Sequence, residues 1–257
     1  MLATLTRTAL TIVIIKVDTH RMNFLTAKWQ NLIMANYAVD PEVLKAYLPK
    51  GVELDFYDGN TYVSLVGFLF KSTKLFGVPV PFFGTFEEVN LRFYVKRKDG
   101  TEWKRGVVFI NETVPHKAVA WMANRLYKEH YTAIPTNHSW KITEESKHIS
   151  YQWKVNGQWN TMEVTAEIAA QSMVHGSFEQ FIFEHYYGFT RINTAASEEY
   201  RVEHPSWLTH PVRKYAIHCD FGASFGNDFR FLNNSEPVAV MLAAGSPVGV
   251  KWKRSRF

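Results

Sequence analysis

Apolar and polar side chains alternate along much of this chain. Residues 88 to 95 read Glu-Val-Asn-Leu-Arg-Phe-Tyr-Val, in which every second position is apolar. Successive side chains of a strand point to opposite faces of a sheet, so this pattern predicts a strand with one apolar and one polar face. Comparable segments recur at roughly a dozen places, which predicts a β-rich protein.

Turn sequences separate several of these segments. The Asp-Gly pair at residues 58–59 predicts a hairpin of residues 54–57 with residues 62–70, and the pair at residues 99–100 predicts a second hairpin further along. Strands joined by such short turns pair with their neighbours in an antiparallel manner. The sheet is therefore predicted to be antiparallel.

Three segments have helical spacing instead. A short helix is predicted over residues 42–47, with Asp40 as its N-cap, and longer ones over residues 117–127 and 177–184. No Pro-rich or Gly/Ser-rich linker divides the chain. Together these patterns predict an α+β fold, a single antiparallel, barrel-like domain over residues 23–257 with a few short helices.

Residues 1–22 are interpreted as an N-terminal extension. The apolar run at residues 9–15 is too short to span a bilayer, and no small-residue cleavage site follows it before Lys16. Met22 is a candidate initiator, because the globular pattern begins directly after it. No membrane association is predicted.

The composition predicts a large hydrophobic core and a reducing compartment. Hydrophobic residues make up 46% of the chain and aromatic residues 15%, enough for a large apolar interior. Cys219 is the single cysteine, so no intrachain disulfide can form. A cytoplasmic location is predicted from this cysteine content.

The net charge of +5 is concentrated in two runs, at residues 96–98 and 251–256. The first precedes a predicted hairpin tip and the second lies at the end of the chain. Both are interpreted as ordinary solvated charge, so nucleic-acid binding is not predicted.

The polar face of the strand at residues 88–95 is the first candidate site. Glu88, Asn90, Arg92 and Tyr94 share this face, opposite a face that is wholly apolar. In a barrel-like sheet such a set lines the interior, where an arginine can bind a carboxylate or carbonyl oxygen. These four residues are predicted to bind a ligand.

The second candidate is His116 with Lys117, where a strand ends and a helix begins. A helix N-terminus has positive potential, which favours anions and lowers the pKa of a nearby lysine. A lysine of this kind can act as a nucleophile, so both residues are candidate catalytic groups. The histidines show no metal-site spacing, residues 222–226 are interpreted as a loop, and neither a metal nor a cofactor is predicted.

Several motifs, in a fixed order, resemble those of a known family. They are Asn36-Tyr37-Ala38-Val39-Asp40-Pro41, Leu48-Pro49-Lys50-Gly51, Tyr62 to Phe68, Glu88 to Val95, Arg105-Gly106-Val107, Glu184-His185-Tyr186 and Glu203-His204-Pro205-Ser206-Trp207. Over residues 29–212 the chain resembles the YqjF-like family of the acetoacetate-decarboxylase-like superfamily. This resemblance implies a β-barrel or cone around a buried cavity, and no settled activity.

In acetoacetate decarboxylase, two adjacent lysines follow a proline, and one of them forms a Schiff base. Pro115-His116-Lys117 is similar to that element, but His116 stands in place of the Schiff-base lysine. Residues 62–70 and 72–81 contain no Asp or Glu to supply the accompanying carboxylates, and the arginine expected near Trp29 is absent. Schiff-base decarboxylation is therefore not expected.

The leading hypothesis is a cytosolic protein with a polar internal cavity that binds a small anionic or carbonyl-containing organic molecule. The alternative is an enzyme that acts on a carbonyl substrate through Lys117 and His116. A third hypothesis is an interaction protein whose basic residues 251–256 contact RNA or an acidic partner. The sequence leaves open whether the chain forms a homo-oligomer.

Overall fold

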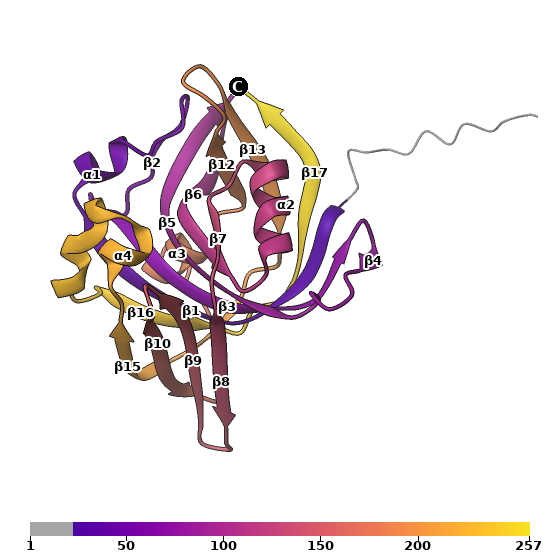
Figure 1. Ribbon diagram of the computed structural model, residues 1–257. Coiled ribbons are helices and arrows are strands. Elements are labelled where there is room, and N and C mark those ends of the chain that lie inside the picture. The colour runs from indigo at the N-terminus through magenta and orange to yellow at the C-terminus, as the bar shows by residue number, and fades with distance from the viewer. Residues whose placement is uncertain (1–22) are drawn as a thin grey trace, which may run out of the picture.

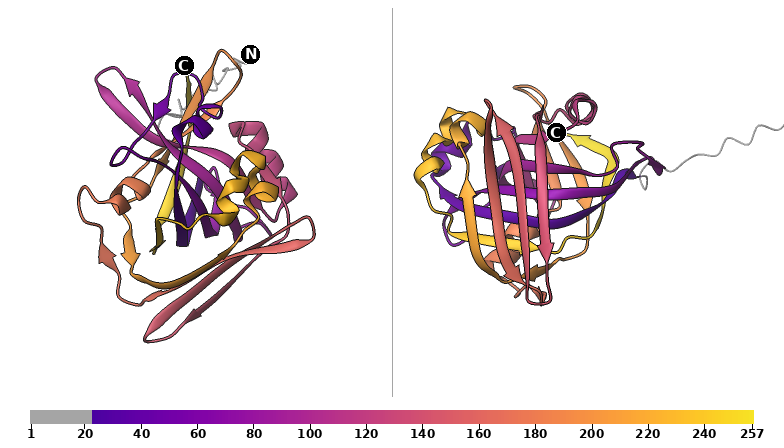
Figure 2. Two further views of the ribbon diagram at one scale, coloured as in Figure 1. Left: turned by 90° about the vertical axis from the view of Figure 1, so that its left-hand side faces the viewer. Right: turned by 60° about the horizontal axis from the view of Figure 1, so that its bottom comes forward.

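A computed structural model describes residues 23–257 of the chain, and the predicted extension at residues 1–22, including Met22, lies outside the described residues. A large curved sheet forms a barrel-like ring, and a second sheet packs against the outside of it (Figures 1 and 2). The predicted antiparallel, barrel-like sheet with a few short helices is confirmed.

Seven strands follow one another around the ring. The ring closes at β1 (Asn23–Val39), which pairs with β17 (Pro247–Arg256) on one edge and with β3 (Thr61–Leu75) on the other. All neighbours in the ring are antiparallel except β12 and β6. In ring order the strands are β1 (Asn23–Val39), β17 (Pro247–Arg256), β13 (Ser197–Glu203), β12 (Tyr187–Arg191), β6 (Glu102–Val114), β5 (Phe86–Asp99) and β3 (Thr61–Leu75).

The second sheet crosses the outer face of the ring (Figure 2). It consists of β15 (Val212–His218), β10 (Gln158–Glu167), β9 (Ser146–Val155) and β8 (Thr136–Ile142), in that order. The two layers approach closely at Gly67 of β3, where a Cβ atom would lie 2.8 Å from Met162 Sδ and 3.0 Å from Tyr151 Cδ2. Glycine at this position therefore allows the two sheets to pack.

Short strands add to the large sheet, and helices pack against it. The short strands are β2 (Glu53–Leu54), β4 (Val78–Pro79), β7 (Tyr131–Ala133), β11 (Gln171–Ser172), β14 (Leu208–His210) and β16 (Ala239–Ala243). The helices are α1 (Pro41–Lys45), α2 (Lys117–Tyr127), α3 (Phe178–Phe183), α4 (Phe221–Phe225) and the 3-10 helix η1 (Asn227–Asn234).

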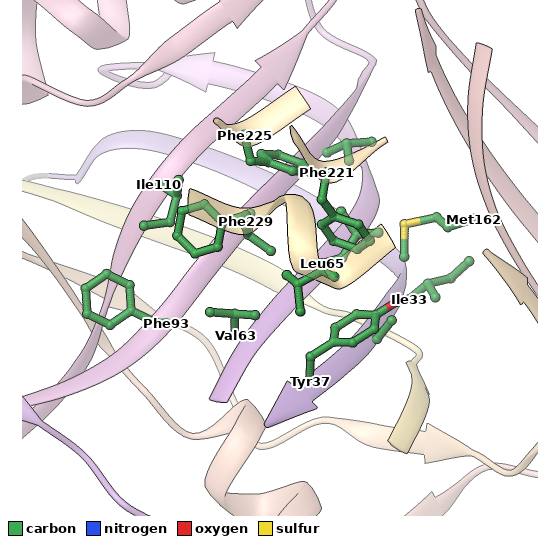
Figure 3. Close-up of a cluster of buried hydrophobic side chains, with 14 of the residues drawn as sticks. Ile33, Tyr37, Val63, Leu65, Phe93, Ile110, Met162, Phe221, Phe225 and Phe229 are labelled. Carbon is green, nitrogen blue, oxygen red and sulfur yellow. The ribbon is translucent and has the colours of Figure 1, made fainter. Parts of the chain in front are cut away.

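Two hydrophobic cores result, one on each face of the ring. The outer core lies between the ring and the second sheet, and Figure 3 shows Phe221, Phe225 and Phe229 of α4 and η1 packed over ring residues such as Val63 and Leu65. The inner core fills much of the ring interior. Because both faces of the ring strands are covered, the polar side chains of β5 lie inside the protein rather than in solvent.

Two local expectations were wrong. The Asp-Gly turn at residues 58–59 forms, but β2 before it pairs with β5 instead of β3. The predicted loop at residues 222–226 is mostly helical, because the Asp220 side chain accepts from Ala223 N and the flanking Phe221 and Phe225 are buried together. Only Gly226 of that segment lies outside α4.

The basic run at residues 251–256, interpreted from the sequence as ordinary solvated charge, forms part of a strand. It belongs to β17, one of the strands that form the ring. Arg254 and Arg256 pair with Glu198 at 3.2 and 3.1 Å, and Lys251 pairs with Glu203 at 2.8 Å. These partners leave less free charge for a polyanion than the sequence alone indicated. Among residues 23–257, no helix is long and apolar enough to cross a membrane.

Candidate functional site

The inner face of β5 lines a cavity inside the ring. Glu88, Asn90 and Arg92 all contribute to its wall, and they are 3%, 2% and 9% exposed. The opposite face of β5, with Val89, Leu91 and the apolar residues that follow, belongs to the outer core. The division of β5 into two faces is therefore as the sequence predicted.

The cavity has a volume of about 110 Å³, and most of its wall is apolar. Aromatic residues of the ring, including Trp29, Phe68 and Phe86, form one part of this wall. Helix α2 covers another part with Val119 and Met122, so the cavity lies between the ring and this helix. The bounds predicted for α2 are confirmed, but Trp121 points outward and is 70% exposed.

Two further glutamates complete a polar cluster on one side of the cavity. Glu112 of β6 lies directly opposite Asn90 in the sheet register, and Glu129 follows the end of α2. Both side chains are buried, at 2% and 7% exposure. The three carboxyls of this cluster therefore come from β5, β6 and the loop after α2.

A β-bulge explains why Glu112 was missed. From the Asp-Gly turn, β5 and β6 pair regularly as far as Arg92 opposite Phe109, and then the register shifts so that Leu91 faces Asn111. The extra residue, Ile110, reverses which later side chains of β6 point inward. Without the bulge Asn111, and not Glu112, would lie opposite Asn90.

Hydrogen bonds hold the glutamates in place. Glu88 accepts from Asn90 Nδ2 at 2.9 Å and from the Tyr131 hydroxyl at 3.1 Å. Glu129 accepts from Thr190 Oγ1 at 2.8 Å. These two glutamates are thus positioned by neighbours on three different strands, β5, β7 and β12, which favours a preorganised site.

Burial makes these carboxyls weak acids. Desolvation raises the pKa of Glu88 to about 7, although its two hydrogen bonds and the charge of Arg92 act in the opposite direction. Desolvation likewise raises the pKa of Glu129 to about 7. The pKa of Glu112 is raised by burial and by the neighbouring carboxyls of Glu129 and Glu88. Acids of this strength exchange protons near neutral pH.

Arg92 is the cation of this cluster. Its Nη2 atom lies 3.5 Å from Met34 Sδ, and its buried Nε atom has no hydrogen-bond partner among residues 23–257. The same is true of Asn90 Oδ1 and Glu112 Oε2. Three buried polar atoms on neighbouring positions of β5 and β6 therefore lack a hydrogen-bond partner in the described part of the chain.

The other predicted site residues do not line the cavity. Tyr94 lies next to it, with the guanidinium carbon of Arg92 5.8 Å from its ring centroid and its hydroxyl 2.6 Å from Ser64 Oγ. Lys117 is exposed at the first position of α2, and the ring of His116 packs on Phe83 with 4.7 Å between centroids. The structure therefore brings Glu88, Asn90 and Arg92 together in the cavity wall, with Tyr94 packed against Arg92 and the His116 and Lys117 pair outside the wall.

Solved structures define the class of fold. An acetoacetate decarboxylase-like enzyme from Sphingomonas wittichii RW1 matches with a TM-score of 0.62 over 97% of this chain and 99% of its own, at 12% identity. The enduracididine biosynthesis enzyme MppR, complexed with the condensation product of pyruvate and imidazole 4-carboxaldehyde, matches with a TM-score of 0.62 over 90% of this chain and 88% of its own, also at 12% identity. The fold is acetoacetate decarboxylase-like.

Within this class, the chain belongs to the DUF2071 family of uncharacterised conserved proteins, whose model matches residues 26–247. The uncharacterised protein YqjF of Bacillus subtilis (strain 168) is 32% identical to it over 90 residues. That match spans 35% of this chain and 36% of YqjF, about a third of each. The predicted resemblance to YqjF-like proteins is thus confirmed.

Proposed function

We propose that this chain binds a small anionic or carbonyl-containing organic molecule in the cavity beside β5. The observation that carries the proposal is Arg92, whose buried Nε atom lacks a hydrogen-bond partner within residues 23–257. A buried charge that is incompletely compensated destabilises a protein by several kcal/mol. An oxygen atom of a ligand, placed at Arg92 Nε, would supply the missing hydrogen bond.

The size of the cavity supports a ligand rather than a single water molecule. One water needs about 10–15 Å³ of this kind of space, so a cavity of about 110 Å³ has room for roughly seven to eleven non-hydrogen atoms. Its mainly apolar wall favours a ligand with a hydrocarbon part. The solved neighbour that holds a pyruvate-derived compound also supports a small carbonyl or carboxylate ligand.

Thermal unfolding tests this proposal with a panel of small carboxylic acids and ketones. A ligand present at about 100 times its dissociation constant stabilises the folded state by about 2.7 kcal/mol. We expect at least one member of the panel to raise the melting temperature of the wild type and not that of Arg92→Met. Arg201→Met is the matched control, because the Arg201 side chain is 57% exposed on the outside of β13.

The control should respond to the ligand as the wild type does. A panel that leaves the wild type unchanged, or an equal shift in Arg92→Met, would count against binding at Arg92. Far-UV circular dichroism of all three proteins would show whether Arg92→Met keeps the fold.

The alternative is an enzyme that acts on a carbonyl substrate through Lys117 and His116. It draws support from the neighbours of this fold that are described as enzymes. Among residues 23–257, however, no lysine lines the cavity, so Lys117 would reach a bound ligand only if α2 moved. Borohydride trapping with 4-methyl-2-oxopentanoate, followed by mass spectrometry, tests this alternative. An adduct present in the wild type and Lys141→Ala but lost in Lys117→Ala would establish it.

A further inference from the structure

The buried polar atoms of the site that lack a hydrogen-bond partner require different partners. Arg92 Nε is a donor and needs an acceptor, as in a carboxylate. Asn90 Nδ2 donates to Glu88, and this hydrogen bond fixes the orientation of the amide. Asn90 Oδ1 is therefore the atom left without a partner, and as an acceptor it needs a donor. Amide oxygens accept and never donate. Within the described residues, the wall of the cavity therefore offers two unpartnered donors, Arg92 Nε and Trp29 Nε1, and an acceptor on the same face of β5 as Arg92.

These atoms lie close together by the geometry of the sheet. Asn90 and Arg92 are two residues apart on β5 and point to the same face. Glu112 faces Asn90 across the ladder, and side chains of directly opposed residues have Cβ atoms about 4.5–5.5 Å apart. A small ligand that bridges the donor and the acceptor must carry an acceptor and a donor of its own.

We infer that the cavity selects a small carboxylate that carries a hydrogen-bond donor, a hydroxyl or an ammonium group, on the carbon next to the carboxylate. The carboxylate would bind Arg92, and the donor would bind Asn90 Oδ1 and Glu112. The inference rests on the proposed function and narrows its ligand class. It disfavours 2-oxo acids, because a keto oxygen has no hydrogen to donate and would leave Asn90 Oδ1 without a partner.

The rest of the wall is consistent with this class. Glu88, Glu112 and Glu129 line the same cavity as Arg92, and each carboxyl has an oxygen that can accept a hydrogen bond. A donor group on the ligand would bind such an acceptor while the carboxylate binds Arg92. The apolar wall formed by residues such as Phe68 and Val119 would hold a branched hydrocarbon side chain.

Four acids with one carbon skeleton test the inference by isothermal titration calorimetry at neutral pH. They are leucine, 2-hydroxy-4-methylpentanoate, 4-methyl-2-oxopentanoate and 4-methylpentanoate. A buried acceptor left without a donor costs enough to weaken binding by about tenfold or more. We therefore expect leucine or the hydroxy acid to bind at least about tenfold more tightly than the oxo acid and the unsubstituted acid.

The first two acids separate the two donor groups. Tighter binding of leucine would assign the site to an ammonium group, and tighter binding of the hydroxy acid would assign it to a hydroxyl. Equal or tighter binding of the oxo acid or of 4-methylpentanoate would overturn the inference while leaving the proposed function standing. Failure of all four acids to bind would also overturn the inference, and the thermal-unfolding panel would then decide the proposed function separately.

Variants of the acceptor atoms provide a second readout. In Asn90→Leu, the affinity for the preferred acid should fall to that for 4-methylpentanoate, whose own affinity should be unchanged. A purely structural role for Asn90 would weaken all four acids together. Glu112→Gln keeps the shape of the side chain and replaces Asn90→Leu if that variant does not fold. In Glu112→Gln, the ratio between the affinities for the preferred and the unsubstituted acid should also be smaller than in the wild type. The inference would be overturned if both single variants fold and both keep the wild-type ratio between the affinities for the preferred and the unsubstituted acid.

Discussion

Replacing Glu88 by glutamine should make the protein more stable at alkaline pH than at acidic pH, relative to the wild type. Burial raises the pKa of Glu88 from 4.5 to about 7. Between these two values the folded chain binds a proton that the unfolded chain releases, so the wild-type carboxyl becomes increasingly destabilising as pH rises. Glutamine has a similar shape but no proton to lose, and removes this pH dependence.

The size of the effect follows from the two pKa values. A difference of one pKa unit between states corresponds to 1.36 kcal/mol, so the carboxyl destabilises the folded state by about 3 kcal/mol at pH 8 and by less than about 1 kcal/mol at pH 5. The variant loses some hydrogen bonding to Asn90 and Tyr131, but that loss is the same at both pH values. The free energy of unfolding of Glu88→Gln minus that of the wild type should therefore rise by about 2 kcal/mol from pH 5 to pH 8.

Urea denaturation of both proteins across this pH range measures the difference directly. Taking the difference removes other titrating groups, such as Asp55, whose pKa is lowered to about 2 chiefly through its hydrogen bonds to His185 and Arg105, against the effect of burial. Glu144→Gln is the matched control, because it makes the same chemical change at an exposed side chain between β8 and β9. The difference between this control and the wild type should be flat over the range. A flat difference for Glu88→Gln would refute the reasoning.

Three substitutions test the packing. Gly67→Ala should lower the free energy of unfolding by about 1–3 kcal/mol in urea denaturation, because its Cβ atom would lie 2.8 Å from Met162 Sδ. Phe221→Ala should cost about 3–5 kcal/mol by the same assay, since this ring is 2% exposed between α4 and the ring strands. Asp40→Ala removes the acceptor for Glu42 N at 2.9 Å and should lower thermal stability by about 1 kcal/mol. An effect near zero in any of them would contradict the corresponding contact.

Local patterns determined much of the fold. Alternation alone divided β5 into an inner and an outer face, because the direction of a side chain on a strand depends only on its position along that strand. Capping and spacing likewise located α2 over Lys117–Tyr127 and identified Asp40 as the N-cap of α1. The site residues that the sequence placed in the cavity, such as Arg92, follow from this local geometry.

The tertiary structure decided the rest of the site. Glu112 turns inward only because a bulge shifts the register of β6 against β5, and Glu129 reaches the cavity only because α2 packs over it. The basic residues 251–256 lie in the ring because β17 pairs with both β1 and β13. Such outcomes depend on partners far away in the sequence, and the periodicity of a single segment contains no information about them.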